Sequence, residues 1–131
     1  MNELAKEILD TVEVGALATV NVDRTPLVTP LHFARLGDSI VWISEPTARH
    51  SENAFRNGKA EFVVWDDKKR AVFLKTNVTE LPESEKEAAM AAYKEKLADF
   101  MSRCQNPQIY VAPIGELDEK TTTGNWLHFI A

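Results

Sequence analysis

The stretch from Pro26 to Asn53 constrains the fold more than any other part of the chain. It opens with a run rich in β-branched and aromatic residues, 26–36, and Gly37-Asp38 separates this run from a second apolar run at 39–44. Two such runs around a turn-forming pair predict a β-hairpin. Glu45-Pro46-Thr47 then ends the second strand, and its threonine is placed to cap a helix. A hairpin that leads directly into a helix is therefore the centre of the predicted fold.

The predicted helix carries Arg49, His50 and Ser51 in its first turn and ends at Asn57-Gly58, residue types that tolerate a left-handed terminus. Free backbone N–H groups and the positive end of the helix dipole gather at a helix start. With a guanidinium and a hydroxyl added, this start makes a seat suited to a phosphate. A solvated cap that binds nothing is the alternative, because the same residue types serve both purposes.

Short strands and further helices are predicted on either side of this unit. Leu4, Ile8 and Leu9 recur at helical spacing and predict a first helix. Ser84 and Glu87 have capping-box spacing and predict the start of a long helix. Its apolar stripe consists of Met90, Tyr93, Leu97, Phe100, Met101 and Cys104. The other strands are predicted at 14–22, 60–65, 71–78, 108–117 and 125–130.

The order of these elements predicts the fold class. Consecutive strands joined by tight turns pair antiparallel, and a set of this size commonly closes into a barrel. We expect a mainly β (α+β) fold, with a single domain over 1–131 and a barrel of about six to seven antiparallel strands flanked by helices. Gly15, Ala16 and Ala18 leave little side chain on the first strand, either for a flat ligand or to relieve crowding.

Composition and missing motifs exclude several classes of partner. The formal charge is −5, which argues against nucleic acid, because phosphate neutralisation dominates that binding. No apolar run approaches the roughly 20 residues of a membrane helix, and no secretory pattern opens the chain. The single cysteine allows no intramolecular disulfide. The chain has no H-E-x-x-H, paired cysteine or G-x-S-x-G pattern, so no metal site is expected. We expect a cytoplasmic protein without a membrane or nucleic-acid partner.

Three segments, at 16–33, 37–44 and 47–60, follow one another in an order and at a spacing that are similar to those of a known family. Over 15–66 the chain resembles the pyridoxamine 5'-phosphate oxidase-like, FMN-binding split β-barrel family. The resemblance implies a homodimer that binds FMN, with F420 or haem as alternative cofactors. It implies an oxidoreductase that passes hydride or electrons between reduced flavin and a small-molecule substrate or electron donor. A non-catalytic flavin or haem carrier on the same barrel is the alternative.

The resemblance also assigns cofactor-binding residues, although it assigns no catalytic one. It implies that the segment Thr29, Pro30, Leu31 and His32 lies beside the flavin ring. It implies that Ser44, at the strand end, and Arg49 hold the phosphate, together with His50 and Ser51 of the same helix start. Trp126 is a further candidate to cover a face of the ring, with a core position as the alternative.

Two departures from the family limit what the resemblance implies. His50 stands where the family usually has lysine, and a histidine with a pKa near 6.5 is mostly neutral at neutral pH. Phosphate affinity is therefore expected to strengthen as the pH falls. The chain closes with residues 126–131 in place of the arginine-bearing segment that grips the substrate phosphate in pyridoxamine-phosphate oxidases. The substrate of those enzymes is therefore not expected here.

Overall fold

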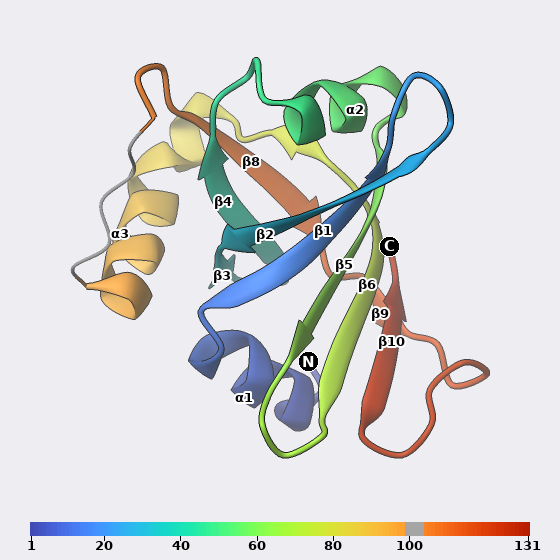
Figure 1. Ribbon diagram of the computed structural model, residues 1–131. Helices are drawn as coiled ribbons and strands as arrows, with labels where there is room; N and C mark the ends of the chain where they lie inside the picture. Colours follow the sequence, from blue (N-terminus) through green and yellow to red (C-terminus); the bar gives the residue numbers. More distant parts are fainter. Residues whose placement is uncertain (99–103) are drawn as a thin grey trace.

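Two β-sheets form the body of the molecule, with helices around them (Figure 1). The computed structural model describes residues 1–98 and 104–131. The strands are β1 (Val14–Val20), β2 (Pro26–His32), β3 (Ala34–Leu36), β4 (Ser39–Ser44), β5 (Lys59–Trp65), β6 (Ala71–Asn77), β7 (Thr79–Glu80), β8 (Gln108–Pro113), β9 (Glu116–Leu117) and β10 (Trp126–Ile130). The helices are α1 (Glu3–Thr11), α2 (Arg49–Asn57), the 3-10 turn η1 (Glu83–Glu85) and α3 (Lys86–Leu97).

The two sheets enclose one apolar core and form a split β-barrel, as expected. The six-stranded sheet has the order β2-β1-β5-β6-β10-β9, and the four-stranded sheet has the order β3-β4-β8-β7. Ile8 and Leu9 of α1 enter this core, in which the rings of Trp42 and Phe62 stack with centroids 6.2 Å apart. A second, smaller cluster joins α3 to the four-stranded sheet through Tyr93 and its neighbours.

The predicted hairpin is divided between the two sheets at Phe33. Strand β2 pairs with β1, whereas β3 pairs with β4, so only β3 and β4 form a hairpin around Gly37-Asp38. Phe33 and Ala34 are both buried, because the chain passes through the core as it changes sheet. The Phe33 ring packs edge-on against Phe62, with centroids 5.1 Å apart. The prediction of one strand over 26–36 was wrong, since a period of two does not reveal a change of sheet.

The C-terminal strands also differ from the prediction. The run at 108–117 is divided into β8 and β9, which lie in different sheets. Strand β10 pairs with β6 in parallel, so the expectation of antiparallel pairing throughout was wrong. The long connection through β7, α3 and β8 gives this parallel pair the crossover that it requires. The described residues contain ten strands, because two predicted runs are divided and β7 was not predicted.

The helices form where the periodicity predicts them, but their starts differ. Helix α1 is capped by the Asn2 side chain, and α2 ends at Gly58 in the left-handed conformation, as expected. The predicted capping box of α3 was wrong, because Glu85 is the N-cap and makes no side-chain hydrogen bond. In the predicted stripe Met90 is exposed, whereas Tyr93 and Leu97 are buried. None of the helices in the described residues is long and apolar enough to cross a membrane.

The last part of the predicted stripe follows the described end of α3 at Leu97. Phe100 and Met101 lie outside the described residues, and Cys104 follows the end of the helix and is half-buried. The described helix therefore buries a shorter stripe than the sequence predicts.

Lys96 ties α3 to the point where the chain changes sheet. Its Nζ donates to the carbonyl of Leu9 at 2.8 Å and to that of Phe33 at 3.0 Å, and it lies 3.5 Å from the Phe33 ring centroid. Burial lowers the pKa of Lys96 to about 8. The Tyr93 hydroxyl adds a bond to the carbonyl of His32 at 3.2 Å. Helix α3 therefore fixes the junction between β2 and β3.

Gly15 provides a test of this core. A Cβ at residue 15 would lie 2.3 Å from Phe62 Cζ, and the Phe62 ring is held by Phe33 and Trp42. Gly15→Ala should therefore lower the free energy of unfolding by about 1–3 kcal/mol, measured by urea denaturation. The loss should shrink in a Phe62→Leu background, and an unchanged midpoint for the single variant would contradict the packing described. For Gly15, relief of crowding explains the small residue.

Candidate functional site

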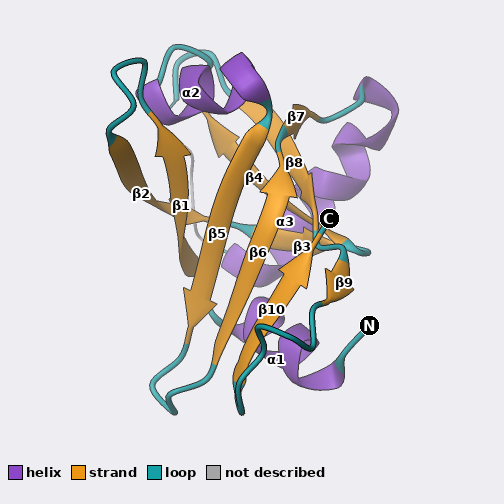
Figure 2. Ribbon diagram, turned by 90° about the vertical axis from the view of Figure 1, so that its right-hand side faces the viewer, coloured by secondary structure: helices purple, strands orange, loops and turns teal. Residues whose placement is uncertain are grey.

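Helix α2 lies across one end of the sheets and is held there by hydrogen bonds more than by an apolar face (Figure 2). Its buried residues are Ser51, Asn53 and Ala54. Asn53 Nδ2 donates to Thr19 Oγ1 at 3.2 Å and to Asn21 Oδ1 at 2.9 Å. Arg56 donates to Asn53 Oδ1 at 2.7 Å and to the Val20 carbonyl at 3.0 Å. This network joins the helix to the end of β1 and fixes its direction.

The start of α2 has no side-chain cap. The expected cap by Thr47 was wrong, since Ala48 is the N-cap and makes no side-chain hydrogen bond. The N–H groups of the first turn are left without a side-chain acceptor, and the helix dipole adds its positive end. An anion satisfies both needs, so this end of α2 is a candidate anion site.

Ser44 and His50 meet beside this helix start. His50 Nε2 lies 2.9 Å from Ser44 Oγ, at the end of β4. Ser44 is buried and His50 is half-buried, and burial lowers the pKa of His50 below its ordinary value. The structure therefore brings together two predicted phosphate contacts, with the imidazole neutral at neutral pH.

Two buried hydroxyl groups at this end of the molecule have no hydrogen-bond partner among the described residues. They are Ser51 Oγ, in the first turn of α2, and Tyr110 Oη, from β8. Burial raises the pKa of Tyr110, and the hydroxyl of Ser51, close enough to interact with the phenol, opposes this rise. The two hydroxyls thus lie near each other, but neither meets the geometry of a hydrogen bond. Buried polar groups without partners are rare and destabilising, so they mark a place where a polar ligand fits. The donors present suit a phosphate group.

Arg49 lies on another side of the helix start. Its side chain is exposed and lines a hollow of about 590 Å³ beside the turn between β1 and β2, together with Arg56, Asp23 and Glu52. The pKa of Asp23 is lowered mainly by hydrogen bonds from Thr25, with a smaller contribution from the charge of Arg49. The structure thus places Arg49 beside the β1–β2 turn, whereas His50 faces Ser44.

The four predicted residues of β2 alternate between the two faces of the sheet. Pro30 and His32 lie opposite Ala16 and Val14 of β1, on the face away from the core. Thr29 lies opposite the buried Leu17, and Leu31 packs against the core cluster. Directly opposite residues share a face, so these four side chains do not form one continuous surface on which a flat ring could lie.

Trp126 lies far from the start of α2 within the chain. The β5–β6 ladder runs from Lys59, next to the end of α2, to Trp65. Trp126 pairs with Ala71 at the far end of this ladder. Its side chain is 54% exposed and its Nε1 donates to the Lys69 carbonyl at 3.2 Å. One chain therefore does not bring Trp126 to the other candidate residues.

Sequence reasoning missed two residues that shape the site. Tyr110 was one of several residues in a predicted strand, and Asn53 was an unremarked polar residue in a short helix. Their positions depend on contacts with Ser51 and with Thr19, which lie on distant segments. The one local signal was the run of polar residues in α2, since a helix that packs through Asn53 needs hydrogen-bond partners.

The fold and the uncapped helix start define the chain as a split-barrel domain with a candidate anion site at the start of α2. Its sequence matches the pyridoxamine 5'-phosphate oxidase family over residues 1–114, and the chain therefore belongs to that family. No curated protein matches the chain.

Solved structures share the fold at low sequence identity. A heme-binding protein from Mycobacterium smegmatis is 21% identical with a TM-score of 0.73, over 86% of this chain and 50% of its own. An F420 reductase is 19% identical with a TM-score of 0.68, over 85% and 93%. An FAD-binding protein from Mesorhizobium loti is 20% identical with a TM-score of 0.69, over 88% and 90%. The chain thus spans about half the length of the first of these relatives.

Asn53→Ala tests how α2 is held. The change removes the three side-chain hydrogen bonds that Asn53 makes. Thr19 and Arg56 each lose one hydrogen-bond partner. We expect the free energy of unfolding to fall by about 2–3 kcal/mol, measured by urea denaturation. Asn57→Ala, at the exposed end of the same helix, should lower the free energy of unfolding by less than Asn53→Ala does. Equal losses in the two variants would show that the Asn53 network does not hold the helix.

Proposed function

We propose that this protein binds FMN and passes hydride or electrons between the reduced flavin and a small organic acceptor. The observation that carries the proposal is the uncapped first turn of α2, where the buried Ser51 hydroxyl has no partner and Ser44 and His50 stand alongside. A phosphate tail with up to two negative charges can accept charge-assisted hydrogen bonds from Arg49 and from the helix N–H groups. Membership of the family supports a flavin-type cofactor.

The chain's own residues would bind and orient this cofactor. FMN, when bound, supplies the hydride and electron chemistry. Strand β2 is an edge strand of its sheet, so the backbone groups along its free side can hydrogen-bond the rim of a flat ring. Pro30 lacks an N–H group, and the pattern of donors along this edge is therefore interrupted at that residue. His32, on the outer face of β2, is the side chain proposed to contact the ring or the substrate, because Thr29 points to the opposite face of the sheet.

A carrier of flavin or haem is the second candidate function, and F420 is the alternative redox cofactor. Structures with this fold include a heme-binding protein and an F420 reductase, which favours keeping both alternatives. An absorbance spectrum of the purified protein with FMN, F420 or haem separates the three ligands. Oxidation of reduced nicotinamide by the FMN-loaded protein then separates an oxidoreductase from a carrier.

Arg49→Gln tests the phosphate seat. Loss of a hydrogen bond to a charged group should weaken FMN binding about 10- to 100-fold, measured by quenching of flavin fluorescence. Riboflavin, which has no phosphate, should bind both proteins equally. Lys68→Gln removes the same charge at the distant β5–β6 turn and should leave FMN affinity unchanged. Equal FMN affinity in wild type and Arg49→Gln would rule out this residue as a phosphate ligand.

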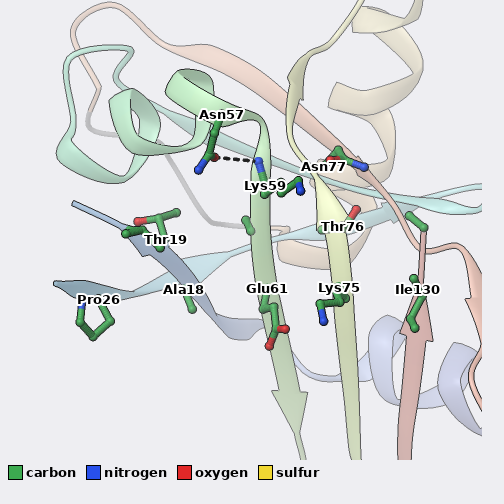
Figure 3. A pocket seen from close by; sticks show the side chains of 13 residues that line it. Ala18, Thr19, Pro26, Asn57, Lys59, Glu61, Lys75, Thr76, Asn77 and Ile130 are labelled. Atoms are coloured by element: carbon green, nitrogen blue, oxygen red, sulfur yellow. Dashed lines mark hydrogen bonds between the residues drawn. The ribbon is translucent and has the colours of Figure 1, made fainter. Parts of the chain in front are cut away.

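We also propose that the protein is a homodimer joined through the outer face of its six-stranded sheet. Directly paired residues place Val28, Ala18, Glu61, Lys75 and Ile130 in one row across five strands of this face. The next row adds Val63 and Phe73. A hollow of about 580 Å³ lies on this face, with Glu61 and Lys75 on neighbouring strands at its floor (Figure 3). Large exposed apolar patches favour association.

A second copy of the chain suits this face. A twofold interface brings the same patch together with itself. A row with apolar ends and one acid beside one base can complement its own copy, because the lysine of each copy can approach the glutamate of the other. The face carries both signs of charge in its middle, so a partner of a single charge sign suits it less well.

Val28→Glu tests the proposed dimer. Val28 is 64% exposed on the outer face, and a buried glutamate at an interface is costly, so the mass in solution should fall from dimer to monomer. Light scattering measures this mass. Val22→Glu, in the turn between β1 and β2 and 80% exposed, is the matched control and should stay dimeric. A wild-type protein that is monomeric at micromolar concentration would contradict the proposed dimer.

A further inference from the structure

We propose that the Ser44–His50 pair couples cofactor binding to the uptake of a proton, so that the flavin phosphate is held by an imidazolium. The inference rests on the proposed function, because it requires a phosphate at the start of α2. It concerns one residue of this chain, His50, and the charge that this residue carries before and after binding.

The residues around His50 favour a neutral imidazole. His50 Nε2 lies 2.9 Å from Ser44 Oγ, and either neutral tautomer satisfies this bond, because a hydroxyl can donate or accept. Burial is the cause of the lowered pKa of His50, and no charged group of the described residues is resolved as opposing it. Burial of the ring therefore outweighs any charge of the described residues in setting the pKa of His50.

The other charged and titratable groups at this end are already engaged or distant in effect. They are Glu45 between β4 and α2, Arg49 and Glu52 on α2, Glu80 on β7, Cys104 after α3 and Tyr110 on β8. Glu45 Oε1 accepts hydrogen bonds from the backbone N–H groups of Gln105 at 2.5 Å and Asn106 at 3.1 Å. The Glu45 carboxylate is therefore engaged with the segment before β8. Arg49 is the cation of the first turn, and Glu52 of the same turn lines the hollow beside the β1–β2 turn with it.

A phosphate changes this balance. The negative charge of a phosphate monoester approaches two at neutral pH, whereas Arg49 supplies only one positive charge. An anion within about 4–6 Å of an imidazole favours the protonated form. The buried Ser51 hydroxyl without a partner lies in the same turn and marks the place for the added acceptor. A lysine here would carry its charge permanently, whereas His50 must take its proton from solvent when the phosphate arrives.

The sign of the pH dependence follows from linkage. Burial lowers the pKa of His50 in the chain itself, and the charge of a bound phosphate would raise it. Between these two values the complex holds more protons than the free protein, so affinity strengthens as the pH falls through this window. At its steepest the change approaches about tenfold per pH unit, and affinity is flat above the window.

Calorimetry of FMN binding near pH 7, in buffers of different ionisation enthalpy, counts the protons directly. The wild-type protein should take up about 0.5–1 proton per FMN. His50→Gln keeps a polar group for Ser44 and should bind FMN more weakly without this uptake. His50→Lys should bind at least as tightly as the wild type, without uptake and with affinity independent of pH between about 6.5 and 8. Any protons exchanged by the phosphate itself are common to all three proteins.

The outcomes separate the inference from the function on which it rests. FMN binding with the same proton count in wild type and His50→Gln overturns the role of His50 and leaves the flavin-binding proposal standing. Failure of the wild-type protein to bind FMN overturns the proposed function, and the inference with it.

Discussion

The passage of the chain from one sheet to the other at Phe33 is the constraint on which the rest of the structure depends. The ring of Phe33 packs edge-on against Phe62, and its carbonyl accepts a hydrogen bond from Lys96 of α3, whose ammonium also lies over the ring. One residue thus joins the core, the junction between the sheets and a helix. Because β2 ends here, the hairpin of β3 and β4 enters the second sheet, and β4 can carry Ser44 to the start of α2.

Local signals predicted the elements well, and tertiary pairing decided the rest. The end of α2 at Gly58 and the turn at Gly37-Asp38 follow from neighbouring residues and were confirmed. The division at Phe33 and the parallel pairing of β10 were missed, because both depend on segments far apart in the chain. The cap by Thr47 was wrong although it was local. A helix start that keeps its N–H groups available is expected where an anion binds.

The candidate site shows the same division between local and distant information. Ser44 and His50 lie six positions apart, so a strand end followed by a helix start was enough to place them together. Tyr110 comes from β8, which pairs with β4 although the two strands are far apart in sequence. Its hydroxyl could be assigned to the site only because the fold places it beside Ser51. Strand β2 needed its register as well, since alternation sends Leu31 to the core and His32 to the opposite face.

The parallel pairing of β10 with β6 has a consequence for how the chain folds. In the large sheet β1 pairs with β2 and β5 pairs with β6 as neighbours in sequence. The two long-range pairings are β1 with β5, across β2, β3, β4 and α2, and β10 with β6, across β7, α3 and β8. Closing such long loops costs entropy before the new backbone bonds form, so the β1–β5 pairing and the docking of β10 are both expected to be slow steps of folding. Until then β6 has an open edge, and during synthesis on the ribosome this edge is where misassembly between nascent chains competes with the native strand.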